Sequence, residues 1–125
     1  MAGNLGRCSG QPDNRLNKYQ IGAAVRSAAS TMVFLYKGAN RNQDSIEAVK
    51  IQDGHMANIN RLSDEGKLIV VGPFLDDKDL RGIFIFDSET ETEVKELVET
   101  DPAIISGRLR YEIHPWMTVK GTCFK

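Results

Sequence analysis

A capping box at residues 44–47 marks the start of a long helix and limits the folds that this chain can adopt. Asp44 can cap the helix and Glu47 can reach back to its first residue. Gly66 stands where a left-handed residue commonly ends a helix, so we expect the helix to run to about Glu65. A helix of this length must bury one face against another element of the fold.

A second capping box, Ser88 with Glu91, predicts a helix that runs to about Thr100. Its apolar residues recur at i, i+3 and i+4, which is typical of a helix with one buried face. The Asp-Pro pair at 101–102 should end it, because proline disfavours helical geometry in the residue before it.

Apolar runs on either side of the two helices read as strands. They span residues 31–38, 67–75, 80–87 and 108–116. The resulting order is βαββαβ, and crossover connections are right-handed in nearly all cases. The simplest arrangement is a ferredoxin-like α+β fold with one antiparallel four-stranded sheet and both helices on one face.

The run "GIFIF" indicates what the other face of the sheet looks like. Ile83 and Ile85 point one way, and Phe84 and Phe86 point the other way. One face takes the helices, and the other is apolar with nothing obvious to cover it, which usually marks an interface. We therefore predict a homodimer packed through this open sheet face. The alternative is that the N-terminal segment folds over it.

Composition excludes several classes of protein. The chain has 125 residues, 41% hydrophobic and 26% charged, which suits a single ordinary globular domain. A net charge of −1 gives no indication of a nucleic-acid partner. The longest apolar run, "KLIVVGPFL", falls well short of the roughly 20 residues that span a bilayer, so no membrane association is predicted.

The two ends of the chain differ from its middle. Residues 1–30 form a polar, basic extension whose composition can resemble a transit peptide, although a poorly ordered polar tail explains it more simply. We place the folded domain at 31–120 and a short tail at 121–125. Cys8 and Cys123 form no metal-binding spacing. They could form one disulfide between the two tails, but nothing demands it, and we expect free thiols in a reducing, cytoplasmic setting.

A histidine interrupts the apolar stripe of the first helix. A helix advances about 100° per residue, which places Ala48, Ile51, Ile59 and Leu62 within about 40° of His55. The imidazole therefore belongs to the face that meets the sheet. Loss of hydration there is costly, so the ring needs a polar partner.

The sequence leaves two alternative hydrogen-bond partners for this imidazole. One is a backbone carbonyl, which would make His55 a structural core residue. The other is the carboxylate of Asp101, which follows the second helix in an extended pre-proline position and precedes the apolar "AII". An Asp–His pair fixes the tautomer and raises imidazole basicity, as a general base requires. Asp101 can also be a simple Asx-Pro turn.

Other polar or unusual residues are weaker candidates. Arg81 could hold an anionic substrate or could simply be solvated. The pair Gly72-Pro73 fits an edge strand or a bulge, or a kink in a cleft wall. The polar loop 40–42 could lie at the mouth of a cleft. We predict no metal site, because the two histidines stand on different elements without clustered ligands.

Four motifs in order resemble the YCII-related domain family. They are "GHMANINRLSDEGKLIVVGPF", "DLRGIFIFD", "DPA" and "EIHPW", and the resemblance covers about residues 31–120. It implies a ferredoxin-like dimer of the dimeric α+β barrel type, similar in architecture to muconolactone isomerases. It also implies an active site with a histidine–aspartate pair, which falls at His55 and Asp101. A few members of that family act as dehydrochlorinases on chlorinated hydroxyquinones.

Two functions follow as hypotheses. The first is a small cofactor-free enzyme of unassigned substrate, in which His55 and Asp101 perform general acid–base chemistry on a small cyclic or aromatic compound, as an isomerase or dehydrochlorinase. The second is a non-catalytic dimeric module that binds a small ligand or another protein. Exposure separates them, because a catalytic imidazole must open onto a pocket of a few hundred Å³.

Overall fold

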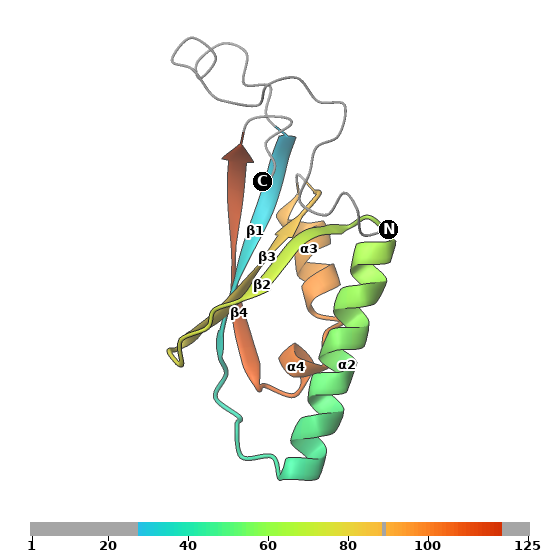
Figure 1. Cartoon of the computed structure of the whole chain (residues 1–125). Helices are drawn as coiled ribbons and strands as arrows, with labels where there is room; N and C mark the ends of the chain where they lie inside the picture. Colours follow the sequence, from blue (N-terminus) through green and yellow to red (C-terminus); the bar gives the residue numbers. More distant parts are fainter. Residues whose placement is uncertain (1–27, 89, 119–125) are drawn as a thin grey trace. The chain divides into compact units, whose positions relative to one another are not determined.

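The described part of the chain is residues 28–88 and 90–118 of a computed structural model, and its helices and strands follow one another in the order βαββααβ (Figure 1). They are β1 (Ala28–Lys37), α2 (Ser45–Asp64), β2 (Leu68–Pro73), β3 (Leu80–Phe86), α3 (Glu91–Val98), α4 (Pro102–Ile105) and β4 (Leu109–Thr118). These strands form one antiparallel four-stranded sheet in the order β2-β3-β1-β4. The predicted ferredoxin-like α+β plan is confirmed.

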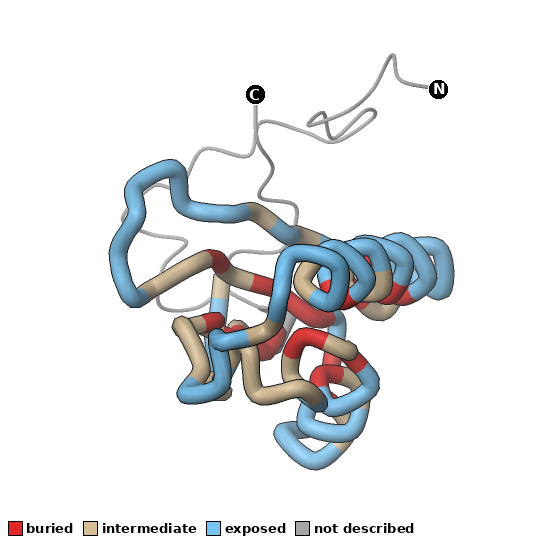
Figure 2. Tube along the Cα trace, turned by 90° about the horizontal axis from the view of Figure 1, so that it is seen from below, coloured by how far each residue is buried: buried red, intermediate tan, exposed pale blue. Residues whose placement is uncertain are grey.

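The core lies between the sheet and the helices, within the unit formed by residues 30–116 (Figure 2). Its buried apolar members are Val33, Leu35, Ile59, Leu62, Leu68, Phe84, Phe86, Val94 and Val98. Val33 pairs with Phe84 across β1 and β3, and Leu68 pairs with Phe86 across β2 and β3. The two phenylalanines of "GIFIF" therefore face the helices, as the alternation predicts.

The outer face of the sheet is less bare than the sequence predicts. Ile85 is only 7% exposed, and its cross-strand neighbour Met32 is half-buried. Side chains of β4 cover part of this face. The ring of His114 meets Phe34 edge-on, with ring centroids 5.3 Å apart, and Arg110 lies 4.5 Å from the centroid of the Tyr36 ring. Homodimerisation through this face stays a prediction.

The first helix begins and ends as the sequence predicts. The side chain of Asp44 accepts a hydrogen bond of 2.8 Å from the backbone N–H of Glu47. At the other end Gly66 has a φ of 77°, and its N–H donates to the carbonyl of Ser63. The N–H of Lys67 donates to the carbonyl oxygen of Leu62, which completes a Schellman ending.

The second helix begins two residues later than predicted. Its N-cap is Thr90, whose side chain accepts from the N–H of Glu93, and not Ser88. Two Ser/Thr-x-x-Glu patterns overlap here, Ser88 with Glu91 and Thr90 with Glu93. Ser88, the first residue of the earlier pattern, is bound to the sheet. Its backbone carbonyl accepts a hydrogen bond of 2.8 Å from the Thr31 hydroxyl, and its side chain is buried. The helix therefore starts at the second pattern.

A short helix, α4, follows the second one, whereas the sequence predicts two helices in all. Asp101 has extended backbone, with φ −77° and ψ 123°, as its pre-proline position requires. Pro102 occupies the first position of α4, where a missing N–H costs nothing. The Asp-Pro pair therefore ends one helix and begins another.

The predicted domain division has two terminal segments, 1–30 and 121–125. Only residues 28–30 of these segments are described, and both cysteines lie outside the described residues. That division stays a prediction. Among the described helices, none is long and apolar enough to cross a membrane.

The loop after β1 passes so close to the chain before β4 that it requires a glycine. The N–H of Gly38 donates to the carbonyl of Arg108 at 2.9 Å. A Cβ at Gly38 would lie 2.8 Å from the carbonyl carbon of Gly107 and would also meet the Gly107 oxygen. Both are backbone atoms and cannot turn away.

We expect Gly38→Ala to lower the free energy of unfolding by about 1–3 kcal/mol, because the two backbone segments must separate. Gly72→Ala is the matched control, since a Cβ at Gly72 meets nothing within 4 Å. Urea unfolding of both variants measures the difference. Equal effects of the two substitutions would contradict the close approach.

Candidate active site

His55 lies on the buried face of α2, as the apolar stripe predicts. Ile51, Ile59 and Leu62 of that stripe are buried, and the His55 side chain is 13% exposed. Its ring stacks beside Phe84 of β3, with centroids 6.2 Å apart and planes 23° apart. Helix and sheet together therefore fix the orientation of the imidazole.

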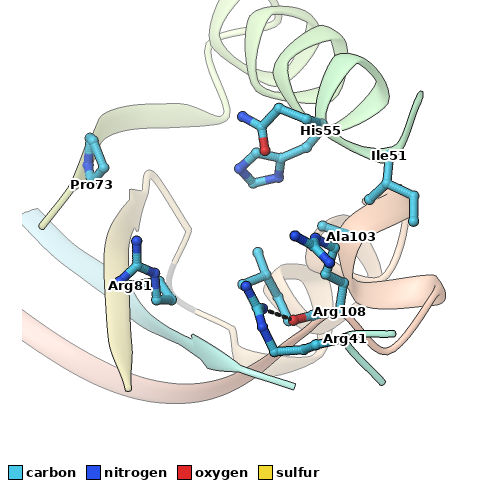
Figure 3. A pocket seen from close by; sticks show the side chains of 9 residues that line it. Arg41, Ile51, His55, Pro73, Arg81, Ala103 and Arg108 are labelled. Atoms are coloured by element: carbon cyan, nitrogen blue, oxygen red, sulfur yellow. Dashed lines mark hydrogen bonds between the residues drawn. The ribbon is translucent and has the colours of Figure 1, made fainter. Parts of the chain in front are cut away.

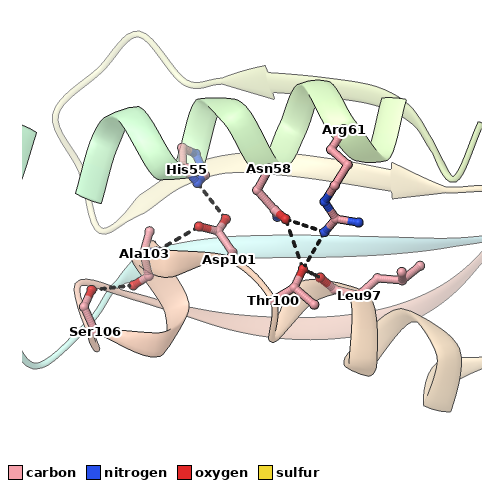
Figure 4. A network of polar contacts seen from close by, with 8 residues as sticks. All are labelled: His55, Asn58, Arg61, Leu97, Thr100, Asp101, Ala103 and Ser106. Atoms are coloured by element: carbon pink, nitrogen blue, oxygen red, sulfur yellow. Dashed lines mark hydrogen bonds and ion pairs between the residues drawn. The ribbon is translucent and has the colours of Figure 1, made fainter. Parts of the chain in front are cut away.

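The partner of this imidazole is Asp101. The Nδ1 atom of His55 lies 2.6 Å from Oδ2 of Asp101, whose side chain is fully buried (Figure 4). The other carboxylate oxygen, Oδ1, accepts a hydrogen bond of 2.8 Å from the N–H of Ala103. Asp101 is therefore both the N-cap of α4 and the partner of His55, and the alternative of a backbone carbonyl as partner is wrong.

This arrangement determines what each nitrogen of the ring can do. A carboxylate only accepts hydrogen bonds, so Nδ1 of His55 must carry a proton to donate to Asp101. In the neutral ring the Nε2 lone pair is then free, and Nε2 makes no hydrogen bond within the described residues. A free lone pair on a fixed ring can take a proton from a ligand.

Two cavities meet at His55. One, of about 240 Å³, is bounded by Arg41, Arg108 and Ala103, and the other, of about 330 Å³, by Met56, Val71 and Phe84. Both are also lined by Gln52, His55, Pro73 and Arg81. Figure 3 shows the imidazole extending from α2 towards the first of these cavities. The ring thus opens onto a space that a small organic molecule can fill.

The Gly72-Pro73 pair ends β2, which is an edge strand, so the edge-strand interpretation of the proline is right. The irregularity of this strand lies between Leu68 and Val70, and not at Gly72. Pro73 lines both cavities and Gly72 lines one, which makes the pair part of the cavity wall.

Arg81 has a structural contact and also reaches the site. Its Nη1 donates to the carbonyl oxygens of Asp76 and Lys78 and to the carboxylate of Asp77, at 3.1–3.3 Å. These bonds hold the turn between β2 and β3. The side chain also lines both cavities, so it brings a positive charge to them.

Arg108 was not singled out from the sequence, and Arg41 was noted only as part of a polar loop. Nη1 of Arg41 donates to the carbonyl of Arg108 at 2.6 Å, and Nη1 of Arg108 donates to the side chain of Gln43 at 2.9 Å. The loop before α2 and the start of β4 are far apart in the sequence. No local pattern therefore indicates that these arginines meet.

A polar network supports the site from the next turn of α2 (Figure 4). Asn58 is buried, and its Oδ1 accepts from Arg61 at 2.7 Å and from the hydroxyl of Thr100 at 3.1 Å. Thr100 immediately precedes Asp101. The network therefore ties α2 to the segment that carries the carboxylate.

No group of three or more histidine, cysteine or acidic side chains that could hold a metal gathers anywhere in residues 28–88 and 90–118. The absence of a metal and of a cofactor stays a prediction for the whole chain.

Gly54 lets α4 approach α2 beside the histidine. A Cβ at Gly54 would lie 2.8 Å from Cγ and 3.3 Å from Cβ of Pro102. Glycine within a helix costs about 1 kcal/mol relative to alanine, so its presence needs a packing reason. Contact with the proline ring supplies one.

We expect Gly54→Ala to destabilise the protein by about 1–2 kcal/mol in spite of the gain in helix propensity, because the new methyl group clashes with Pro102. In a Pro102→Ala background the same substitution should be neutral or stabilising. Urea unfolding of the four proteins in this double-mutant cycle gives the coupling. Additive effects would rule out the contact.

Comparisons with known proteins place this chain in a family. None of the curated protein sequences matches the chain. Among solved structures, the chain is similar to the 5-chloro-2-hydroxyhydroquinone dehydrochlorinase TftG from Burkholderia phenoliruptrix AC1100, in complex with 2,5-dihydroxybenzoquinone. The identity is 26% over 70% of this chain and 92% of that chain, with a TM-score of 0.51. The YCII-related domain matches residues 31–117, well over half of the sequence, and the chain therefore belongs to the YCII-related domain family.

Proposed function

We propose that this protein is a small enzyme that moves a proton on a small hydroxylated cyclic or aromatic compound. His55 is the group that takes and returns the proton, and Asp101 positions it. The observation that carries the proposal is the 2.6 Å contact between the two side chains, on a ring that opens onto a cavity. A sealed imidazole would have favoured a non-catalytic binding module instead.

The similarity to TftG motivates the type of reaction. That protein is a dehydrochlorinase of a chlorinated hydroxyhydroquinone. Removal of HCl from such a ring needs no electron acceptor, since chloride leaves with the bonding electron pair. The protein therefore needs only to transfer protons and to stabilise charge, and a positioned imidazole can do both.

The chemistry proceeds in two proton transfers. Nε2 of His55 takes a proton from a hydroxyl of the substrate and returns it to the ring carbon that bears chlorine, which gives a ketone. The imidazole then takes a proton from a second hydroxyl while the carbon–chlorine bond breaks, and chloride leaves. The net loss is one proton and one chloride. Isomerisation of a related substrate stops after the first transfer.

Asp101 contributes without touching the substrate. Its negative charge stabilises the imidazolium that forms when Nε2 is protonated, and its fixed oxygen holds the ring with Nε2 towards the cavity. Because the carboxylate is fully buried, solvent screens this interaction little.

We place a second copy of the chain against the outer face of the sheet, where Met32, Phe34 and Ile83 are only half-buried. We also assign the protein to the cytoplasm, which remains a prediction from the sequence alone.

We expect His55→Gln to lower kcat by about 10²–10⁴-fold on 5-chloro-2-hydroxyhydroquinone, or on the best substrate in a panel of hydroxylated aromatics and lactones. Asp101→Asn should also lower kcat more than it raises KM. An amide has only one acceptor oxygen for the two donors, Ala103 N–H and His55 Nδ1–H, and if that oxygen stays with Ala103 an NH2 group faces the ring. Chloride release and product absorbance measure the rates.

His114→Gln serves as the matched control, since that histidine is about half exposed on β4 and lines neither cavity. It should retain wild-type activity. Turnover that persists in His55→Gln, or no proton transfer on any compound in the panel, contradicts the proposed enzyme.

A further inference from the structure

Three arginines surround one end of the cleft beside His55. Arg41 lies in the loop before α2, Arg81 lies on β3, and Arg108 immediately precedes β4 (Figure 3). None of the residues that line this cavity is acidic. A cavity lined by charges of one sign concentrates ligands of the opposite charge.

Within the described residues, Arg41 and Arg108 differ from Arg81 because neither is held in an ion pair. Arg41 donates to a backbone carbonyl and Arg108 to an amide oxygen, and neither forms an ion pair with a described carboxylate. Arg81 does have one, since Asp77 lies 3.3 Å from its Nη1. Loss of hydration lowers the pKa of Arg41, and the positive charges of Arg108 and Arg81 lower it further, while the negative charge of Asp77 acts in the opposite direction.

Unused hydrogen-bond donors remain on Arg41 and Arg108. Each of the bonds that Arg41 and Arg108 make uses Nη1, so Nη2 and Nε of each guanidinium are left without a hydrogen-bond acceptor among the described residues. A guanidinium presents its donors as a planar fork, which matches two oxygens of a delocalised anion.

The second cavity, which Arg81 also lines, is mostly apolar. Met56, Ile59, Val71 and Phe84 line the second cavity, which shares His55 with the first. An apolar wall on one side of the imidazole and arginines on the other suit a ligand with an apolar ring and a charged oxygen group.

We propose that Arg41 and Arg108 form an anion-binding subsite, and that the ligand of this cleft is a planar ring compound that carries an ionised oxygen group, either a carboxylate or an ionised enolic hydroxyl. The apolar part of the ring lies towards Phe84, the charged group lies between the two arginines, and His55 faces the ring between them. The inference that the ligand is a planar ring compound rests on the proposed function, whereas the inference that Arg41 and Arg108 bind an anion does not.

The subsite also bears on the reaction. When Nε2 of His55 removes a proton from a hydroxyl, negative charge develops on the substrate. Fixed guanidinium groups at the end of the same cavity stabilise that charge without reorganisation. Binding and proton transfer therefore favour the same orientation of the substrate.

Isothermal titration tests the subsite with three probes of similar size. 2,5-Dihydroxybenzoquinone carries ionised enolic oxygens, 2,5-dihydroxybenzoate carries a carboxylate, and 2,5-dimethoxybenzoquinone is neutral. We expect at least one of the two anions to bind the full chain about 10-fold or more tightly than the neutral compound, and the tighter one identifies the charged group.

Arg41→Gln and Arg108→Gln should each weaken binding of that anion by about 10- to 100-fold and leave the neutral compound unaffected. Arg41→Lys keeps the charge and should restore part of the affinity. Arg110→Gln is the matched control, because Arg110 lies two residues further along, pairs with Asp79 and stacks on Tyr36. It should bind as wild type does. Melting temperatures verify that each variant is folded.

Equal affinity for neutral and anionic probes, no binding of either anion at millimolar concentration, or an equal loss in Arg110→Gln would overturn the subsite. His55→Gln separates this inference from the proposed function. If that variant and the wild type bind the anion alike and neither shows turnover, the subsite stands and the enzyme proposal fails.

Discussion

The structure of the site depends on one contact, between an imidazole in the middle of α2 and a fully buried carboxylate at the start of α4. A carboxylate without partners in such a place costs several kcal/mol. Asp101 avoids this cost because the N–H of Ala103 and the ring of His55 each donate to one of its oxygens. The same need for donors keeps α4 close to α2, which the absent side chain of Gly54 permits.

Local rules account for what the sequence predicts correctly. Asp44 and Gly66 fix the ends of α2, and helical periodicity alone then turns His55 to the buried face. The extended backbone of Asp101 follows from the proline after it. The βαββαβ order places both helices on one face of the sheet, so the side chains of His55 and Asp101 can come into contact. The contact was therefore predictable, whereas a role for it in catalysis is a proposal.

Features that depend on distant contacts were not predictable in this way. Thr90 rather than Ser88 caps α3, because the sheet already holds the carbonyl of Ser88. Arg108 reaches the cleft because Gly38 lets two backbone segments pass closely. Partial cover of the outer sheet face comes from polar side chains of β4, whose pairing with aromatic rings of β1 no periodicity indicates.

The most direct test of the account is the tautomer of His55, measured by nitrogen-15 NMR on histidine-labelled protein. The account predicts that the neutral ring carries its proton on Nδ1, that Nε2 is unprotonated, and that Asp101→Asn abolishes this preference. The exposed ring of His114 provides a reference in the same spectrum. A neutral His55 with its proton on Nε2, or a spectrum that Asp101→Asn leaves unchanged, would contradict the central claim.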